Sequence, residues 1–337
     1  MRLLIVRLGA FGDILHTLPL AADLVAAGHE VGWWCEDRWA SVLEGSSVVA
    51  RVHRLPRRAL RDPAGGLLPR LRLLRSAVAE VRAIGYDVVI DAQGLAKSAL
   101  LARAVGAPLV VGHHRPRARE GAWLLADRRV RSPSVHVIDQ QRDLGCALGL
   151  APTGPWRFSL PAWPTQVEAM TTWLQAQGLH KPWMLNVGAG WPTKVWPEAR
   201  QEALLRRLKV DGQAIVVVWG SPAERAVAER IIAAAGHGTL APSTTLPELC
   251  ALLAQAAVVI SGDTGPLHAA QAVGTPAIGL FGPVPAERNG PRGPAYRTFQ
   301  APGAAWERQD VSKVDMGAID DGHVRDAAAV VAQFARP

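Results

Sequence analysis

The chain has 337 residues, of which 49% are hydrophobic and 20% charged, and its formal net charge is +8. This composition is typical of a globular protein and excludes a disordered chain, and the length suits two domains better than one. No apolar run approaches the roughly 20 residues of a membrane span. The three cysteines lie far apart without disulfide or metal-site spacing, so we expect a cytoplasmic protein without a metal or other cofactor.

Short apolar runs alternate with helical stretches throughout the first half of the chain. The runs that we expect to be strands lie at 2–6, 30–35, 86–90 and 108–112. They are continuous rather than alternating, which is typical of strands that are buried on both faces of a parallel sheet. The pattern predicts a Rossmann-like N-terminal domain over residues 1–155.

The pattern breaks at 150–164, where four prolines and no periodicity indicate a linker. A second series of apolar runs and helical stretches then predicts another Rossmann-like domain over 165–320. The fold class that we expect is therefore α/β, with two doubly wound domains that face each other across a cleft. The closing segment, 321–337, is predicted to be an amphipathic helix that packs back on the N-terminal domain.

Ligands of doubly wound sheets bind at the carboxyl ends of the strands, so residues that directly follow the strands are the candidates for a site. After the first strand, "RLGAFGDILHTLP" places Asp13 at the start of a helix. Asp13 is either a helix cap or a carboxylate that accepts a proton from a sugar hydroxyl. After a later strand, "DAQGLAKSALLAR" places Gln93 and Lys97 either against an acceptor or at a solvated helix start.

In the second half, "LNVGAGWPTKVWPEAR" (185–200) combines a glycine-rich loop with Lys194 just before a helix. Exposed backbone N–H groups and a lysine at a helix start are typical of an anion site. The spacing G-x-x-x-x-G-K-[ST] is absent, which excludes a P-loop NTPase, and the missing G-x-G-x-x-G disfavours a dinucleotide dehydrogenase. Glu224 follows another strand, where its carboxylate could accept hydrogen bonds from ribose hydroxyls.

The segment "SGDTGPLHAAQAVGTP" (261–276) ends a buried strand and opens a helix. Backbone N–H groups around Thr264 and Gly265 would point out of the helix N-terminus, where the helix dipole favours phosphate oxygens. Asp263 would repel a phosphate, so we expect it to hold the loop or a sugar hydroxyl. His268, one turn later, either donates to a departing phosphate or packs against the neighbouring loop.

The positive charge is concentrated in two stretches of the first half. Residues 51–75 hold eight arginines against one aspartate, and 113–131 is also rich in arginine. This concentration indicates either a polyanionic partner or a solvated surface. A nucleic-acid partner is disfavoured, because no recognition helix or basic motif interleaved with aromatic residues is found.

Taken together, these segments resemble glycosyltransferase family 9, the ADP-heptose:lipopolysaccharide heptosyltransferases. The resemblance covers nearly the whole chain, and "DAQGLAKSA" resembles the members that add the first heptose to the Kdo–lipid A acceptor. It implies a GT-B fold, transfer with inversion at the anomeric carbon, and no metal. Ala189 and Gly190 depart from the family pattern, because relatives carry hydroxyl groups there.

The resemblance also implies roles for individual residues. Asp13 matches the proposed general base. The donor-binding positions are Gly12, Lys194, Glu224, Asp263, Thr264, Gly265 and His268. The positions that would bind the anionic acceptor are Arg57, Arg58, Arg61, Gln93, Lys97 and Arg119.

The implied partners are ADP-heptose, a Kdo–lipid A type acceptor and the anionic inner face of the inner membrane, where the enzyme would lie peripherally. Three alternatives stay open from the residues alone. They are another GT-B transferase or an epimerase with a different nucleotide sugar, a non-catalytic sugar-binding module, and a basic nucleic-acid-binding protein.

Overall fold

The computed structural model describes residues 1–62, 66–152, 154–305 and 314–335. The chain divides into two compact units, Met1–Ala162 and Trp163–Pro337, and the division falls inside the proline-rich segment predicted to be a linker. Parts of three predicted features lie outside the described residues: residue 153 of the linker, residues 63–65 of the arginine-rich stretch, and residues 336–337 of the closing helix.

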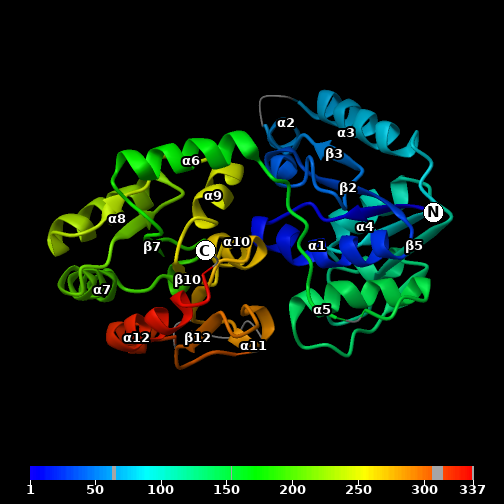
Figure 1. Cartoon of the computed structure of the whole chain (residues 1–337). Coiled ribbons are helices and arrows are strands. Elements are labelled where there is room, and N and C mark those ends of the chain that lie inside the picture. The colour runs from blue at the N-terminus through cyan, green and yellow to red at the C-terminus, as the bar shows by residue number, and fades with distance from the viewer. Residues whose placement is uncertain (63–65, 153, 306–313, 336–337) are drawn as a thin grey trace. The chain divides into compact units, whose positions relative to one another are not determined.

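The first unit is built on a six-stranded parallel sheet (Figure 1). Its strands are β1 (Arg2–Val6), β2 (Glu30–Glu36), β3 (Arg51–Leu55), β4 (Val88–Asp91), β5 (Leu109–His113) and β6 (Arg128–Val130). Its α-helices are α1 (Phe11–Ala26), α2 (Arg57–Arg61), α3 (Leu67–Arg82), α4 (Ala96–Ala104) and α5 (Val137–Arg142). The strand order is β3-β2-β1-β4-β5-β6, so the winding reverses between β1 and β4. Ligands of such sheets bind at this reversal.

The second unit repeats this topology. Its strands are β7 (Trp183–Asn186), β8 (Ile215–Val218), β9 (Thr239–Leu240), β10 (Val258–Gly262), β11 (Ala277–Phe281) and β12 (Tyr296–Gln300). Its α-helices are α6 (Pro164–Ala176), α7 (Glu198–Val210), α8 (Pro222–Ala235), α9 (Leu246–Leu253), α10 (Gly265–Val273), α11 (Ala286–Asn289) and α12 (Asp321–Ala332). The order β12-β11-β10-β7-β8-β9 places the reversal between β7 and β10.

Both faces of the second sheet are covered by helices. Alternate strand residues such as Leu185, Val217 and Ile260 share one hydrophobic core with α7, α8 and α12. Met184 and Val259 directly precede Leu185 and Ile260, so they point to the opposite face of the sheet, yet they are also fully buried. Burial on both faces explains why these strands are continuous apolar runs. The predicted doubly wound, parallel α/β fold is therefore confirmed in each unit.

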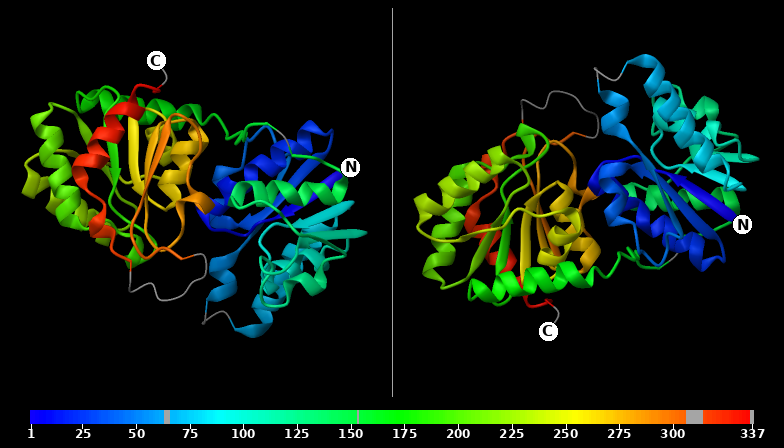
Figure 2. Two further views of the ribbon diagram at one scale, coloured as in Figure 1. Left: turned by 90° about the horizontal axis from the view of Figure 1, so that it is seen from below. Right: turned by 90° about the horizontal axis from the view of Figure 1, so that it is seen from above.

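The closing helix α12 packs on the core of the second unit, and the further expectation that it packs back on the N-terminal domain stays a prediction. Val324, Ala328 and Val331 are fully buried in the core of the second unit, together with Leu204 and Leu208 of α7. Figure 2 shows α12, in red, alongside the strands of this unit. These three residues follow the spacing i, i+4, i+7, so they form one apolar stripe, and the second unit covers it.

Polar contacts also tie α7 and the residue Trp196, just before it, to the start of α12. Asp321 is buried and accepts hydrogen bonds from Arg207 (2.6 Å) and Arg200 (2.9 Å). Burial alone would raise the pKa of Asp321, but the hydrogen bonds from the two arginines outweigh it, and the pKa lies below its ordinary value. The indole N–H of Trp196 donates to the carbonyl of Ile319 at 3.1 Å. The segment that precedes α7 is thereby anchored to the start of α12.

In the described part of the chain, no helix combines the length and the apolar character needed to cross a membrane.

We predict that Asp321→Asn lowers the free energy of unfolding by roughly 2 kcal/mol. This is less than the loss expected when a fully buried ion pair is broken, because Arg207 reaches solvent. The folded pKa of Asp321 is depressed, so its contribution is complete above its unfolded pKa of about 4 and is lost as the pH falls further. Urea unfolding followed by tryptophan fluorescence should show a difference in unfolding free energy between the variant and the wild type that becomes smaller at acidic pH. Asp326→Asn, at an exposed position of the same helix, is the control. An equal gap at neutral and acidic pH would contradict the assignment.

Candidate functional site

The loops that follow β7 and β10 are joined where the winding of the second sheet reverses. Asn186, the last residue of β7, connects them through its side-chain amide. The amide N–H groups donate to the carbonyl of Gly188 (2.8 Å), Ser261 Oγ (3.1 Å) and Thr264 Oγ1 (3.3 Å). The sequence prediction missed this residue, although a polar side chain at the end of a buried apolar strand was the available signal.

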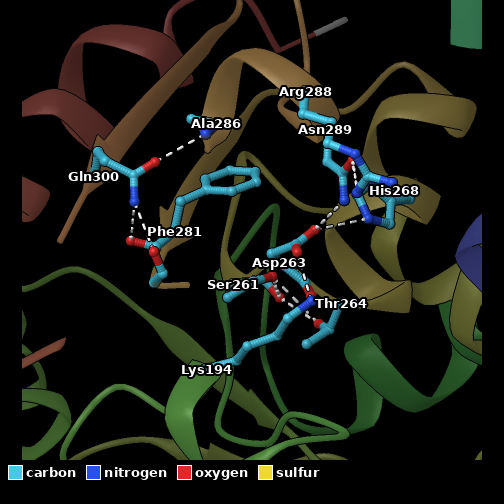
Figure 3. A network of polar contacts seen from close by, with 12 residues as sticks. Lys194, Ser261, Asp263, Thr264, His268, Phe281, Ala286, Arg288, Asn289 and Gln300 are labelled. Atoms are coloured by element: carbon cyan, nitrogen blue, oxygen red, sulfur yellow. Dashed lines mark hydrogen bonds and ion pairs between the residues drawn. The ribbon is translucent and has the colours of Figure 1, made fainter. Parts of the chain in front are cut away.

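A buried ion pair lies at the same edge of the sheet (Figure 3). Lys194 Nζ donates to Asp263 Oδ2 at 2.5 Å and to the carbonyl of Asp263 at 3.2 Å. His268 Nε2 lies 3.3 Å from the other carboxylate oxygen, Oδ1, to which Asn289 donates at 3.4 Å. Asp263 and His268 are only 4% and 5% exposed. Three predicted donor-site residues, from two segments of the chain, thus meet at the Asp263 carboxylate.

The Asp263 carboxylate is held in its charged form. Burial by itself would raise the pKa of Asp263, but the hydrogen bond and charge of His268 and the ammonium of Lys194 outweigh it, so the pKa lies well below its ordinary value. Asp263 therefore serves as the counter-charge that fixes the position of Lys194. The two hydrogen bonds that Nζ donates use two of its three N–H groups, and the lysine side chain remains 18% exposed.

The N-terminus of α10 opens beside this ion pair. Thr264 is its N-cap, but the Thr264 side chain makes no capping hydrogen bond, whereas Ser221 and Thr245 cap α8 and α9. The Thr264 hydroxyl instead contacts Ser261 Oγ at 3.1 Å. In the first turn Pro266 has no N–H and the Leu267 N–H donates to the carbonyl of Thr264 at 3.1 Å, so the Gly265 N–H is the donor that the helix start offers. Together with the helix dipole, it favours an anion at this point.

Glu224 lies against the glycine loop that follows β7. It is in the first turn of α8, and its Oε2 accepts a hydrogen bond from the N–H of Gly220 at 2.8 Å. A Cβ atom on Gly188 would lie 1.9 Å from Glu224 Oε1, so only glycine permits this approach. By contrast, a Cβ on Gly190 would meet no atom within 4 Å. Gly188 therefore positions Glu224, and Gly190 leaves the loop open.

Arg7 links the corresponding loops of the first unit and orients Asp13. Arg7 is buried, and its Nη1 donates to the carbonyl of Ala92 at 2.6 Å. Its Nη2 lies 2.6 Å from Asp13 Oδ2, which also accepts the N–H of Ala10 at 3.2 Å. Asp13 is at position N3 of α1, next to Gly12, and its hydrogen bond from the N–H of the N-cap residue Ala10 is one half of a capping box, so it does take part in capping the helix. Its side chain is 43% exposed, and both of these contacts use the same carboxylate oxygen.

The side chain of Gln93 forms a hydrogen bond within the first unit. Its side-chain oxygen accepts the backbone N–H of Leu8 at 2.9 Å, which ties the loop after β4 to the loop after β1. Asp91, the buried end of β4, accepts the N–H groups of Gln93 and Gly94 at 3.1 Å each. Burial raises the pKa of Asp91 despite these hydrogen bonds.

Glu36 gathers part of the predicted acceptor site. It is the last residue of β2, it is buried, and both of its oxygens accept hydrogen bonds from Arg57 Nη1, at 2.6 and 2.7 Å. Lys97 Nζ, from α4, lies 4.0 Å from the same carboxylate. The sequence prediction missed both Glu36 and Arg7. The only available signal was a charged residue within or at the end of a buried strand.

The other predicted acceptor residues are not drawn into this cluster. Arg58 and Arg61 are exposed on α2, and Arg119 is exposed in the loop after β5. The backbone N–H of Arg119 donates to the carbonyl of Gly94 at 2.8 Å, which brings its loop next to that of Gln93.

The groups that the second unit offers suit an anion. They are an ammonium, uncapped helix N–H groups and a glycine loop, all at the point where doubly wound sheets bind ligands. In the part of the chain that the structure describes, no cluster of three or more His, Cys, Asp or Glu side chains is arranged to hold a metal ion.

The chain is similar to proteins of known family. The sequence model of glycosyltransferase family 9 (heptosyltransferase) matches residues 74–316. A lipopolysaccharide heptosyltransferase 1 from Pseudomonas aeruginosa is 33% identical over 84% of this chain and 79% of that protein. Two structures of the Escherichia coli heptosyltransferase WaaC, with ADP and with ADP-2-deoxy-2-fluoro heptose, are 26% identical over 98% of this chain, with TM-scores of 0.80 and 0.78. They cover 100% and 99% of the WaaC chains.

We predict that Lys194→Met and Asp263→Asn are coupled in their effects on stability. Each single variant leaves a buried partner without its counter-charge and should lose roughly 2–4 kcal/mol of unfolding free energy. The double variant should lose less than the sum, because neither charge is then stranded. Since the folded pKa of Asp263 is depressed, the loss in Asp263→Asn should be complete above about pH 4 and fade as the pH falls below it. Urea unfolding of the four proteins measures the cycle, and strictly additive losses would contradict the ion pair.

Proposed function

The chain belongs to glycosyltransferase family 9, the heptosyltransferases, and on this premise we propose that it transfers a heptose from ADP-heptose to the Kdo-bearing inner core of lipopolysaccharide. We propose further that transfer inverts the anomeric carbon and uses no metal. The observation that carries the proposal is the Lys194–Asp263 ion pair beside the uncapped N-terminus of α10. The lipopolysaccharide heptosyltransferase of P. aeruginosa and the ADP-bound E. coli neighbour support the choice of donor and acceptor.

The donor diphosphate binds to the second unit. The third N–H of the Lys194 ammonium and the N–H groups at Thr264 and Gly265 contact its oxygens, while Asp263 and His268 hold the lysine and the loop in place. Glu224 accepts hydrogen bonds from the adenosine ribose. The charge that accumulates on departing ADP is then stabilised by an ammonium and a helix terminus, which is the type of stabilisation that a metal otherwise provides.

Asp13 is the general base of the transfer step. Its carboxylate takes the proton of the acceptor hydroxyl, whose oxygen forms a bond to the anomeric carbon from the face opposite the diphosphate. The bond from that carbon to the phosphate oxygen breaks, and ADP departs with the electron pair. Because Arg7 and the Ala10 N–H both contact Oδ2, Oδ1 remains to accept the proton. Gly12 keeps the backbone beside the base free of side-chain bulk for the donor.

The acceptor is an anionic lipid saccharide. Arg57 and Lys97, held around Glu36, bind its carboxylates or phosphates together with the exposed Arg58, Arg61 and Arg119. Gln93 keeps the neighbouring loop in position. An acceptor of this kind places the enzyme peripherally at the cytoplasmic face of the inner membrane.

A transfer assay with ADP-heptose tests the function as a whole. The acceptors are de-acylated Kdo-bearing saccharides truncated at successive sugars, and product mass and anomeric configuration are measured. We expect one heptose to be added to an acceptor that ends in Kdo, with the inverted configuration, in the presence of a metal chelator. No transfer from ADP-heptose, with transfer from a different nucleotide sugar, would overturn the proposal.

We predict that Asp13→Asn lowers kcat by roughly 10²–10⁴-fold, the usual contribution of a general base. Calorimetry should find ADP binding unchanged, because the diphosphate site lies on the second unit. Asp87→Asn is the control, since Asp87 precedes β4 at the opposite end of the same sheet. Near-normal turnover in Asp13→Asn would remove it as the base.

We predict that Lys194→Ala weakens ADP binding roughly 10–100-fold and also slows transfer, since it removes a charge-assisted hydrogen bond to the diphosphate. Lys194→Ala also removes the ion pair with Asp263, and the fall in melting temperature without nucleotide measures that separate effect on stability. Lys209→Ala, at the exposed end of α7, should leave ADP binding unchanged. Wild-type affinity for ADP in Lys194→Ala would contradict the phosphate role, whatever its stability.

A further inference from the structure

Helix α3 carries three exposed leucines in its first two turns. Leu67, Leu68 and Leu71 are 71%, 68% and 44% exposed. Scattered exposed apolar residues need no explanation, but three within one short segment of a helix form a patch, and such patches mark interaction surfaces.

The unit's core does not use these leucines. The second half of α3 packs on the core of the first unit through a separate stripe, in which Ala77 and Val81 are buried and Leu74 and Val78 are half-buried. This stripe has the spacing i, i+3, i+4, i+7, so it uses one full face of the helix. The leucines of the first two turns are therefore not part of the stripe that packs on the core.

The exposed face of α3 combines these leucines with arginines. Positions 68, 71, 72, 75, 79 and 82 share one face of the helix, and all six are exposed. They are two leucines, three arginines and one alanine. Glu80, the acidic residue of α3, is also exposed but lies outside these six positions. A helix face of leucine and arginine is typical of helices that lie in the plane of a membrane interface, with leucines among the acyl chains and guanidinium groups at anionic head groups.

We infer that the exposed face of α3 docks the protein on an anionic lipid bilayer. A protein partner fits less well, because this face has no aromatic anchor, and interface cores are enriched in aromatic residues and depleted in charge. The inference deepens the proposed function, on which it rests for the acceptor being a lipid. In the first unit α3 packs next to α2, which carries Arg57, Arg58 and Arg61 (Figure 1). Docking through α3 would therefore hold the proposed acceptor cations at the level of the lipid head groups.

Vesicle sedimentation tests the inference directly. The full chain is mixed with vesicles of phosphatidylcholine alone or of phosphatidylcholine with phosphatidylglycerol, and the bound fraction gives a partition coefficient. The wild type should bind the anionic vesicles, with an affinity that falls as salt is added. Leu68→Ser with Leu71→Ser should lower the partition coefficient at least roughly tenfold. Arg72→Gln with Arg75→Gln should also lower it roughly tenfold and flatten its dependence on salt.

Matched controls lie on the second unit. Val210→Ser replaces an aliphatic residue that is 87% exposed at the end of α7. Arg225→Gln with Arg230→Gln makes the same change in charge at two exposed arginines of α8. Both controls should bind the anionic vesicles like the wild type. Melting temperatures should be close to that of the wild type for all variants, because the changed side chains are exposed.

Transfer to a de-acylated acceptor separates this inference from the proposed function. The α3 variants should transfer heptose to that water-soluble acceptor at the wild-type rate. Vesicle binding that is lost in the leucine pair would support the inference even if no heptose transfer were found. Wild-type vesicle binding in the leucine pair, or no binding by the wild type itself, would overturn it even if transfer were normal.

Discussion

The ion pair between Lys194 and Asp263 is the interaction on which the second unit's site depends. An aspartate with so little exposure would be neutral if it stood alone, because burial favours the uncharged acid. The ammonium, His268 and Asn289 keep it charged, and in return the carboxylate holds the ammonium beside the first turn of α10. Gly262 makes this approach feasible, since a Cβ there would lie 3.0 Å from the carbonyl oxygen of Lys194. The absence of a side chain at Gly262 thus helps to position the Lys194 ammonium.

The first unit uses the same device with the signs reversed. In each unit a buried ion at the reversal of the sheet fixes a more exposed ion of opposite charge: Arg7 fixes Asp13, and Asp263 fixes Lys194. The buried member satisfies its remaining hydrogen bonds with backbone or side-chain groups, as a buried charge must. The exposed member is oriented without being enclosed. An oriented carboxylate on one domain and an oriented ammonium on the other are the two charges that the proposed transfer reaction needs.

The arginine-rich part of the chain is organised in a similar way. Glu36 is a buried acid at the end of β2 that is contacted by Arg57 of α2, by Lys97 of α4 and by the nearby Arg38. Cations of this kind would otherwise repel one another, so a shared counter-charge allows two of them to face one ligand. On the neighbouring helix α3, two leucines are followed by three arginines on one exposed face, and the acidic Glu80 lies outside that face. Helices α2 and α3 therefore present different surfaces, one suited to the anionic groups of the proposed acceptor and one suited to a bilayer.

The alternation of strands and helices, the fold class and the segments that meet at the two reversals of the sheets all follow from the sequence alone. They do so because strands covered on both faces are continuous apolar runs, and because ligand-binding residues directly follow such strands. The sequence did not determine that α12 packs on the second unit, because the apolar stripe of Val324, Ala328 and Val331 shows that one face is buried but not which surface buries it. Nor did it reveal the partners of Arg7, Glu36 and Asn186. Those contacts join residues far apart in the chain, and only the tertiary packing brings them within hydrogen-bonding distance.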